Sequence, residues 1–277
     1  MNAARKPSRL NAVIVNYRTP DLTLKCVASI VAHGVAAPAD IVVVENASPD
    51  DSYARLSAEL SGVRLLQAAN NGGFGAGVNL GAALCEADYI LVLNPDTYFE
   101  DGSLNKALAV LDSQPEVGLV GLDLVYPGGE RQYSARRFYS LLDVLGRRLP
   151  LGRYWPVKAR IERHLMRTAW DSGAPFEAEW VMGTGFVVRR ELFFKLHGMD
   201  EAYFLYMEDV DLCARVWQSG AKVICVPGAR LVHDHQRSSA AGPLSWAGRL
   251  HLQSLLRFRQ KFHVPLVRQP GVAGLWR

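Results

Sequence analysis

The feature that most constrains the fold is a regular alternation of short, continuous apolar runs with segments of helical period. The strands are predicted at "NAVIVNY", "DIVVVEN", "VRLLQ" and "DYILVLN", and the helices between them at "DLTLKCVASIVAHG", "SYARLSAEL" and "GAGVNLGAALCEA". Continuous apolar strands are typical of parallel sheets covered on both faces. The first ~100 residues are therefore predicted to form successive βα units of an α/β fold.

The second half is less regular. A helix at "SLNKALAVLDS" and a strand at "VGLVGLDLVY" precede a basic segment with one or two short helices. We then expect one strand at "EWVMGTGFVVRR", a helix at 204–220, a strand at "AKVICV" and a last helix at about 244–262. This order predicts one domain over residues 8–239. Residues 240–277 are predicted to be a basic helical appendage, packed on the domain or at a membrane surface.

Composition narrows the class of protein. The chain has 277 residues, 49% of them hydrophobic and 21% charged, as in a soluble globular protein. No apolar run approaches the ~18 residues of a membrane span, and the apolar stretch 12–15 is too short for a signal peptide, so we expect a cytoplasmic protein. The four cysteines lack metal-like spacing and are predicted to be reduced and buried.

The formal charge of +4 is unevenly distributed. Residues 131–167 contain ten Lys or Arg against two acids, with aromatic residues between them. Such a segment is either a solvated surface or a contact with an anionic membrane face or phosphorylated lipid. No motif supports nucleic-acid binding, so we expect no nucleic-acid partner.

Three carboxylates start the helix at 204–220. At about 100° per residue, the apolar side chains fill one arc of this helix, and Asp209 falls inside that arc. Asp211 falls on the opposite, solvated side, where it is spaced to pair with Arg215. Burying Asp209 is costly unless the carboxylate has a function, and the role of a general base in a cleft is one such function. Glu208 lies beside it.

Polar residues follow three of the predicted strands, where parallel sheets bind ligands. Each of these three sets of residues could equally form an ordinary turn, because Asn, Asp, Ser and Pro initiate turns. Together they place Glu45 and Asp96 on one edge, where a hard divalent cation, Mg²⁺ or Mn²⁺, would favour the Asp96 oxygens. His233 is a second candidate ligand and His235 a weaker one. The polar residues at these strand ends are Asn16, Tyr17, Arg18, Thr19, Glu45, Asn46, Ala47, Ser48, Asn94, Pro95, Asp96 and Thr97.

The Gly-rich stretch "NNGGFGAGVNLG", residues 70–81, leads into a helix whose N–H groups could receive a phosphate. Its glycine spacing does not give the GxGxxG fingerprint of dinucleotide-binding proteins.

These segments together resemble glycosyltransferase family 2, whose members have the GT-A fold, and especially its rhamnosyltransferase-like branch. The resemblance runs from about Leu10 to Ser239. It rests on the segments "VIVNYRTPDLTLKCVASI", "IVVVENASPDDS", "NNGGFGAGVNLGAALCEADYILVLNPDTYF", "VMGTGFVVRRELFFKLHGMDEAYFLYMEDVDLCARVWQSGAKV" and "HDHQRSS". It implies a Rossmann-like, mostly parallel sheet flanked by helices.

The resemblance also implies roles for residues. Tyr17 and Arg18, with Asn16 before them, would contact the nucleotide, and Glu45, where the family usually has Asp, would meet its base or ribose. Asn71 and the glycines from Gly73 would line the nucleotide side. Asp96 matches the last acid of the metal-binding DxD motif and Asn94 replaces the first. Asp209 matches the catalytic base, and Glu208 could hold a neighbouring hydroxyl or orient Asp209. Trp180, Gly183 and Thr184 could shape the sugar or acceptor pocket, or could simply be strand core.

The implied activity is inverting transfer of a sugar from a nucleotide-diphosphate donor, with dTDP-rhamnose as the lead and UDP-hexoses behind it. The acceptor would be a saccharide or a lipid-linked saccharide of a surface polysaccharide, with the protein peripheral on the inner membrane face. Two alternatives are a nucleotide-dependent oxidoreductase and a non-catalytic, membrane-associated binding module.

Overall fold

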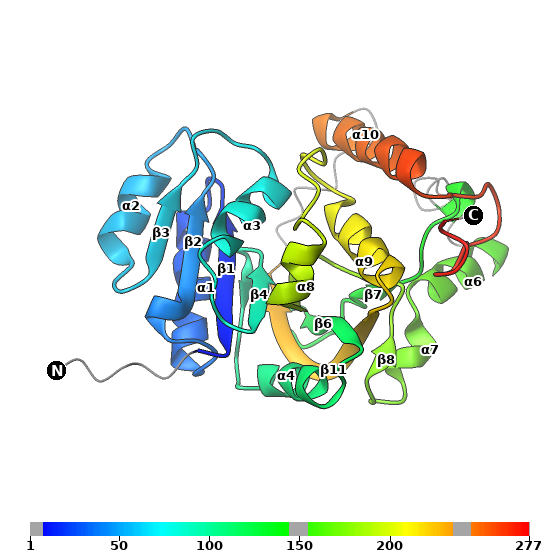
Figure 1. Cartoon of the computed structure of the whole chain (residues 1–277), viewed down its shortest axis with the longest axis horizontal. Coiled ribbons are helices and arrows are strands. Elements are labelled where there is room, and N and C mark those ends of the chain that lie inside the picture. The colour runs from blue at the N-terminus through cyan, green and yellow to red at the C-terminus, as the bar shows by residue number, and fades with distance from the viewer. Residues whose placement is uncertain (1–7, 144–154, 235–244, 277) are drawn as a thin grey trace.

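The computed structural model describes residues 8–143, 155–234 and 245–276, and it consists of a central sheet with helices on both sides (Figure 1). The sheet order is β3-β2-β1-β4-β10-β6-β11-β5, with β8 paired to β11, and β7 and β9 form a separate pair. The strands are β1 Leu10–Asn16, β2 Ile41–Glu45, β3 Arg64–Gln67, β4 Tyr89–Leu93, β5 Thr97–Tyr98, β6 Val117–Val125, β7 Ala135–Arg136, β8 Phe176–Glu177, β9 Trp180–Val181, β10 Gly185–Arg189 and β11 Lys222–His233.

The helices match the predicted periodic segments in the first half and add short ones in the second. They are α1 Pro20–Ala32, α2 Ser52–Glu59, α3 Phe74–Ala82, α4 Leu104–Ser113, α6 Trp155–His164, α7 Arg167–Trp170, α8 Arg190–Lys195, α9 Glu208–Gln218 and α10 Trp246–Lys261. The two hydrophobic core clusters draw on opposite faces of β1: Val13 and Val15 belong to one, and Ala12 and Ile14 to the other. The predicted βα units are therefore confirmed, and all four cysteines are buried.

The sheet is mixed beyond β4. Strands β1 to β4 pair in parallel, but β10 runs antiparallel to both β4 and β6. Because β10 is reversed, its first residue, Gly185, lies opposite Leu93 at the carboxyl end of β4. The residues just before β10 therefore arrive at the ligand-binding edge of the sheet.

The prediction of one continuous strand at "EWVMGTGFVVRR" was wrong. The chain forms β9, breaks at residues 182–184, and resumes as β10. At this break the chain passes from one ladder to another. The Met182 N–H donates to the Ser134 carbonyl beside β7, and the Thr184 carbonyl accepts from the Asn94 N–H beside β4. Between them, the Gly183 N–H donates to Asp209. Strand periodicity alone does not show such a diversion.

The placement of Asp211 on the solvated side of its helix was also wrong. Asp211 is fully buried, whereas Asp209 is partly exposed. The predicted pair with Arg215 is present at 2.5 Å, but Lys261 of α10 also binds Asp211 and covers it. A helical wheel cannot show that a second helix lies over its polar side (Figure 1).

Part of the basic segment is structural. Arg131 makes a two-point contact with the buried Asp123 at 3.0 and 3.2 Å, and Arg160 binds the buried Asp143 at 2.6 Å. Three further arginines of this segment, at 147, 148 and 153, lie outside the described residues. This segment is therefore not simply a solvated surface.

The C-terminal helix α10 packs on the domain through Leu255 and Phe258, which join the same core cluster as α9. The predicted boundary at residue 239 and the candidate ligand His235 lie outside the described residues. Within the described ranges, no helix is long and apolar enough to cross a membrane.

The burial of Asp211 generates a stability prediction. Replacing Asp211 with Asn leaves Arg215 and Lys261 facing a neutral amide, and breaking such a buried pair typically costs about 3 kcal/mol. Urea unfolding of Asp211→Asn should show this loss, whereas the exposed Glu130→Gln control should stay within about 0.5 kcal/mol of wild type. Equal stability of the two variants would contradict the buried pair.

Candidate active site

A buried polar cluster lies at the carboxyl ends of β1 and β2. Asn16 and Glu45 are partners in the strand ladder, and the Asn16 amide donates to Glu45 Oε1 at 3.4 Å. The Ser48 N–H donates to the same oxygen at 2.9 Å. Glu45 is fully buried, and its other oxygen, Oε2, has no hydrogen-bond partner among the described residues. Since an unpaired buried acceptor is costly, Oε2 is suited to accept from a ligand hydroxyl or N–H.

The residues that follow β1 form an exposed rim beside this cluster. Tyr17 is 42% exposed, and Arg18 adopts a left-handed backbone with φ of 59°. The Arg18 N–H donates to Ser48 Oγ at 2.9 Å, and its guanidinium lies 3.8 Å from Asp50. This contact ties the loop after β1 to the loop after β2.

The Gly-rich loop is held against the turn that precedes α9. Asn71 Oδ1 accepts from the Gly73 N–H and from the Asn46 amide, both at 3.0 Å. Gly73 has a φ of 89°, and a Cβ there would lie 2.1 Å from the Phe204 carbonyl oxygen. Only glycine fits this position, so Gly73 lets the Gly-rich loop and the turn before α9 approach each other closely.

Asp96 and His233 meet at the end of the sheet. Strand β5 pairs antiparallel with β11, which sets His233 opposite Thr97, and the Asp234 N–H donates to the Asp96 carbonyl at 2.9 Å. His233 Nε2 lies 3.3 Å from Asp96 Oδ2. The other oxygen, Asp96 Oδ1, is buried and has no hydrogen-bond partner within the described residues.

Gln132 fixes the state of the His233 ring. Its amide nitrogen donates to the His233 carbonyl at 2.8 Å, so its oxygen faces His233 Nδ1 at 2.7 Å. Nδ1 must then carry a proton, and a neutral ring presents the lone pair of Nε2 toward the carboxylate of Asp96. Two acceptors at that distance are stable only with a proton or a cation between them, as in metal sites where the second ring nitrogen donates to a polar group.

Asp209 is held from two sides at the start of α9. Its Oδ2 accepts from the Gly183 N–H and its Oδ1 from the Val210 N–H, both at 2.8 Å. A Cβ on Gly183 would lie 3.1 Å from the Asp209 Cβ, so a small residue is favoured there. The Asp209 carboxylate is therefore fixed against the chain break between β9 and β10.

A strained turn delivers this carboxylate. Tyr206 and Met207 both have left-handed backbones, with φ of 70° and 69°. For residues with side chains, such conformations cost of order 1 kcal/mol each, and they are enriched at functional sites. Residues 204–207 are called the catalytic turn below.

The chain break links the candidate base to the candidate metal residue. The Thr184 carbonyl accepts from Asn94, two residues before Asp96, and the preceding Gly183 N–H donates to Asp209. The structure thus brings the carboxyl end of β4, the start of β10 and the start of α9 to one edge of the sheet.

The environments of Glu208 and Asp209 differ. Burial, together with the neighbouring Asp209 carboxylate, raises the pKa of Glu208 to about 8, and Glu208 Oε2 has no hydrogen-bond partner in the described part of the chain. Burial also raises the pKa of Asp209, but the Gly183 and Val210 N–H groups and the nearby Arg136 oppose that rise. The two acids thus differ in their surroundings: Glu208 has an oxygen without a partner and a raised pKa, whereas two backbone N–H groups stabilise the charged form of Asp209.

Trp180, a candidate for the sugar or acceptor pocket, lies in the hydrophobic core. Trp180 is buried among Tyr139 and His164, and its indole N–H donates to the Arg137 carbonyl at 2.9 Å, so its surroundings are those of a core residue. Sequence reasoning gave no site role to Gln132 or Arg136, because both lie in the irregular basic segment and no periodicity marks them.

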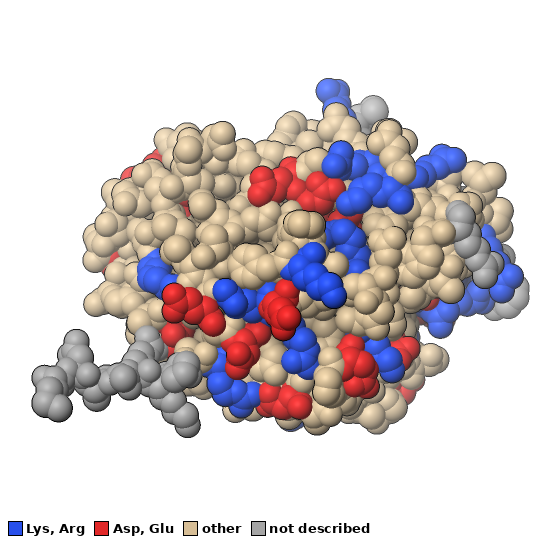
Figure 2. Space-filling view, viewed as in Figure 1, with Lys and Arg blue, Asp and Glu red and all other residues tan. Residues whose placement is uncertain are grey.

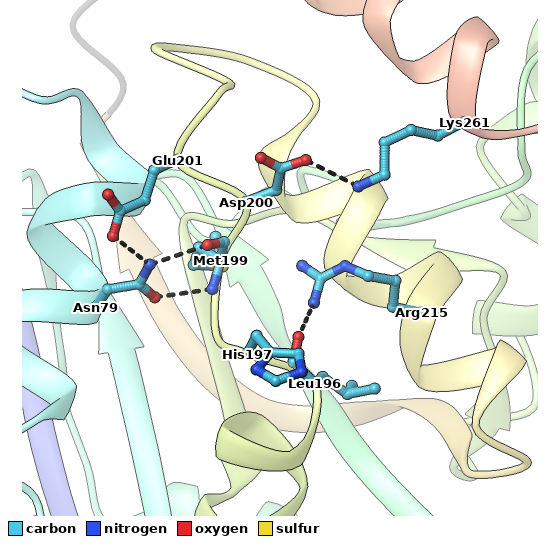
Figure 3. A pocket seen from close by; sticks show the side chains of 8 residues that line it. All are labelled: Asn79, Leu196, His197, Met199, Asp200, Glu201, Arg215 and Lys261. Atoms are coloured by element: carbon cyan, nitrogen blue, oxygen red, sulfur yellow. Dashed lines mark hydrogen bonds and ion pairs between the residues drawn. The ribbon is translucent and has the colours of Figure 1, made fainter.

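A separate cavity of about 360 Å³ is lined by Asn79, by residues of the loop between α8 and α9, and by Arg215 and Lys261 (Figure 3). Asn79 bonds the Met199 backbone and Glu201 on one side, and Lys261 binds Asp200 on the other. None of the candidate site residues lines it. Its contacts anchor the loop between α8 and α9.

Comparison with known proteins identifies the family. Residues 12–211 match the profile of Glycosyl transferase family 2, and the chain belongs to this family. It is 31% identical over 219 residues to N-acetylglucosaminyl-diphospho-decaprenol L-rhamnosyltransferase of Mycobacterium tuberculosis, covering 75% of this chain and 70% of that protein. It is 27% identical over 196 residues to the rhamnosyltransferase WbbL of Escherichia coli K12, covering 67% and 69%. The resemblance drawn from the sequence is confirmed.

Solved structures confirm the GT-A fold. GalNAc-T7, solved with UDP, GalNAc and Mn²⁺, superimposes with a TM-score of 0.64 at 17% identity, over 91% of this chain and 48% of that one. The mannosyltransferase PcManGT from Pyrobaculum calidifontis, solved with GDP-Man and Mn²⁺, gives 0.62 at 15% identity, over 98% and 69%.

The raised pKa of Glu208 predicts how stability depends on pH. Between about pH 4.5 and 8, unfolded Glu208 has lost a proton that folded Glu208 retains, so raising the pH favours unfolding. Glu208→Gln lacks this penalty and should gain up to about 5 kcal/mol over wild type as the pH rises through that window. Urea unfolding at several pH values measures it. If the difference in unfolding free energy between the two proteins does not change with pH, the pKa of Glu208 is not raised.

Proposed function

We propose that this glycosyltransferase moves a rhamnosyl group from a nucleotide-diphosphate donor, with dTDP-rhamnose as the lead, to a lipid-linked saccharide. The observation that carries the proposal is that Asp209 and Asn94, which lies two residues before Asp96, both bond to the Gly183–Thr184 segment. The names of the two rhamnosyltransferase relatives support the choice of sugar, and the diphospho-decaprenol in one name supports a lipid-linked acceptor. Membership of a transferase family argues against the oxidoreductase alternative.

The donor would lie along the ends of β1, β2 and β4. Glu45 Oε2 would accept from the base or ribose, since it is buried and lacks another donor within the described chain. Tyr17 and Arg18 on the exposed rim would cover the nucleotide, and the Asn71–Gly73 loop would line its other side. UDP-hexoses are the second class of donor.

The residues present fit a divalent metal. Asp96 offers an unpartnered oxygen, and His233 offers a nitrogen whose orientation Gln132 fixes. Magnesium and manganese are commonly held by one or two protein groups, with substrate phosphates and water completing the coordination. Asp96 and His233 would hold the metal, and Asn94 would lie beside the diphosphate. When bound, the metal would neutralise charge on the departing diphosphate.

A side chain of the protein takes up the proton that the acceptor hydroxyl loses. As the acceptor hydroxyl oxygen bonds to the anomeric carbon, the bond from that carbon to the diphosphate oxygen breaks, and Asp209 takes the hydroxyl proton. Attack from the side opposite the leaving group inverts the anomeric centre. Glu208, kept neutral by its surroundings, would donate to a substrate oxygen. A peripheral position on the inner membrane face follows from the acceptor and stays a prediction.

Donor choice is tested by thermal shift. A ligand at about 100 times its dissociation constant stabilises the folded chain by about 2.7 kcal/mol, a rise of a few degrees in the melting temperature. dTDP-rhamnose with Mn²⁺ should give the largest rise among sugar nucleotides, and EDTA or Asp96→Ala should reduce it. A larger rise in melting temperature with a UDP-hexose would contradict the choice of sugar. A rise that EDTA does not change would contradict the proposed metal site.

The division of labour between the two acids is tested by isosteric variants. Asp209→Asn should lower the rate of transfer by about 10²–10⁴-fold, because the amide cannot accept the proton. Glu208→Gln keeps a donor and a neutral charge, and it should retain activity within about tenfold. Initial rates of nucleoside diphosphate release in the presence of acceptor measure both. A larger loss in Glu208→Gln than in Asp209→Asn would reverse the assignment.

A further inference from the structure

The C-terminal helix α10 carries an exposed face that the core does not use. Trp246 is 65% exposed, and Leu252 and Leu256 are each 50% exposed, with the exposed Arg249 and Arg259 beside them. At 100° per residue these five side chains fall within an arc of about 140°. They therefore share one side of the helix, called here the outer face of α10.

This end of the chain is strongly basic. Residues 235–277 contain seven Lys or Arg and no Asp or Glu, so they carry a formal charge of +7 against −3 for the other residues. Within α10, Arg257 and Lys261 bind Asp200, but Arg249 and Arg259 form no ion pair with any described residue. Figure 2 shows the blue side chains gathered at upper right, where Figure 1 places α10.

The opposite side of α10 contacts the catalytic turn. The rings of His251 and Tyr206 lie 5.3 Å apart, and Ser254 Oγ donates to the Leu205 carbonyl at 2.9 Å. Trp246 lies at the edge of the outer face nearer to this turn, and its ring reaches Phe204, with ring centroids 6.1 Å apart. Since a helix with its side chains is about 10 Å across, a surface touching the outer face lies about one helix diameter from this turn.

We propose that the outer face of α10 docks on an anionic membrane surface and so presents the catalytic turn to an acceptor anchored there. The anchoring lipid of the acceptor rests on the proposed function; the docking surface does not. Leu252, Leu256 and Trp246 would enter the interfacial region, while Arg249 and Arg259 would meet lipid phosphates. Each arginine near an anionic surface contributes about a fivefold gain in binding.

The chemistry of this face favours a membrane over a second copy of the chain. In a symmetric dimer through α10, Arg249 and Arg259 would face the same arginines of the partner, and the helix has no acid to neutralise them. Basic residues alone would suit a nucleic acid, but exposed leucines and tryptophan between them are typical of interfacial helices.

Vesicle flotation of the whole protein tests the proposal without donor or acceptor. Wild type should float with phosphatidylglycerol–phosphatidylcholine vesicles, lose flotation at high salt, and stay unbound with phosphatidylcholine alone. Leu252→Glu/Leu256→Glu should reduce the bound fraction at least about tenfold. The matched control is Leu80→Glu/Leu84→Glu, two leucines with the same spacing, one in α3 and one just after it, 40% and 37% exposed, which should float as wild type.

Three results would overturn the proposal: no flotation of wild type, equal flotation of the α10 variant, or a dimer by light scattering that the α10 variant converts to a monomer. Circular dichroism and melting temperature verify that both double variants fold. The α10 variant should keep wild-type transfer to a water-soluble acceptor and lose transfer to an acceptor embedded in vesicles. Absence of transfer by every form, with flotation intact, would contradict the proposed function and leave the docking surface standing.

Discussion

One hydrogen bond organises the candidate site: the Gly183 N–H donates to Asp209 Oδ2 at 2.8 Å. It joins the start of α9 to the break between β9 and β10, and one residue later Thr184 accepts from Asn94 at the end of β4. Because β10 runs antiparallel between two strands of the opposite direction, this break falls at their carboxyl ends. Without that reversal, the candidate base and the candidate metal residue would have no common edge.

The sequence predicts the first half of the fold well because each element there is determined locally. Continuous apolar strands alternate with amphipathic helices, and the resulting parallel order needs no long-range information. The break at residues 182–184 is different, because β9 pairs with β7 while β10 pairs with β4 and β6, and the Gly183 N–H between them donates to Asp209. The reversal of β10 likewise depends on its neighbours in the sheet.

The residues of the candidate site also fall into two groups, those that the sequence could predict and those that it could not. Asp96 and Glu45 could be proposed from their position at strand ends, and Asp209 from its conflict with the apolar side of its helix. Gln132 and the burial of Asp211 could not, because each depends on contact with a remote segment: Gln132 meets His233 from the basic segment, and α10 covers Asp211. Family membership gives the reaction class, while these contacts give the protonation and orientation of the groups.

The most direct test of the account is a crystal structure of the protein with Mn²⁺ and dTDP-rhamnose. We expect the metal between Asp96, His233 and the diphosphate, with the anomeric carbon turned toward the Asp209 carboxylate and the nucleotide beside Glu45. A donor bound elsewhere, for example in the cavity lined by Arg215, or a metal that does not touch Asp96, would contradict it.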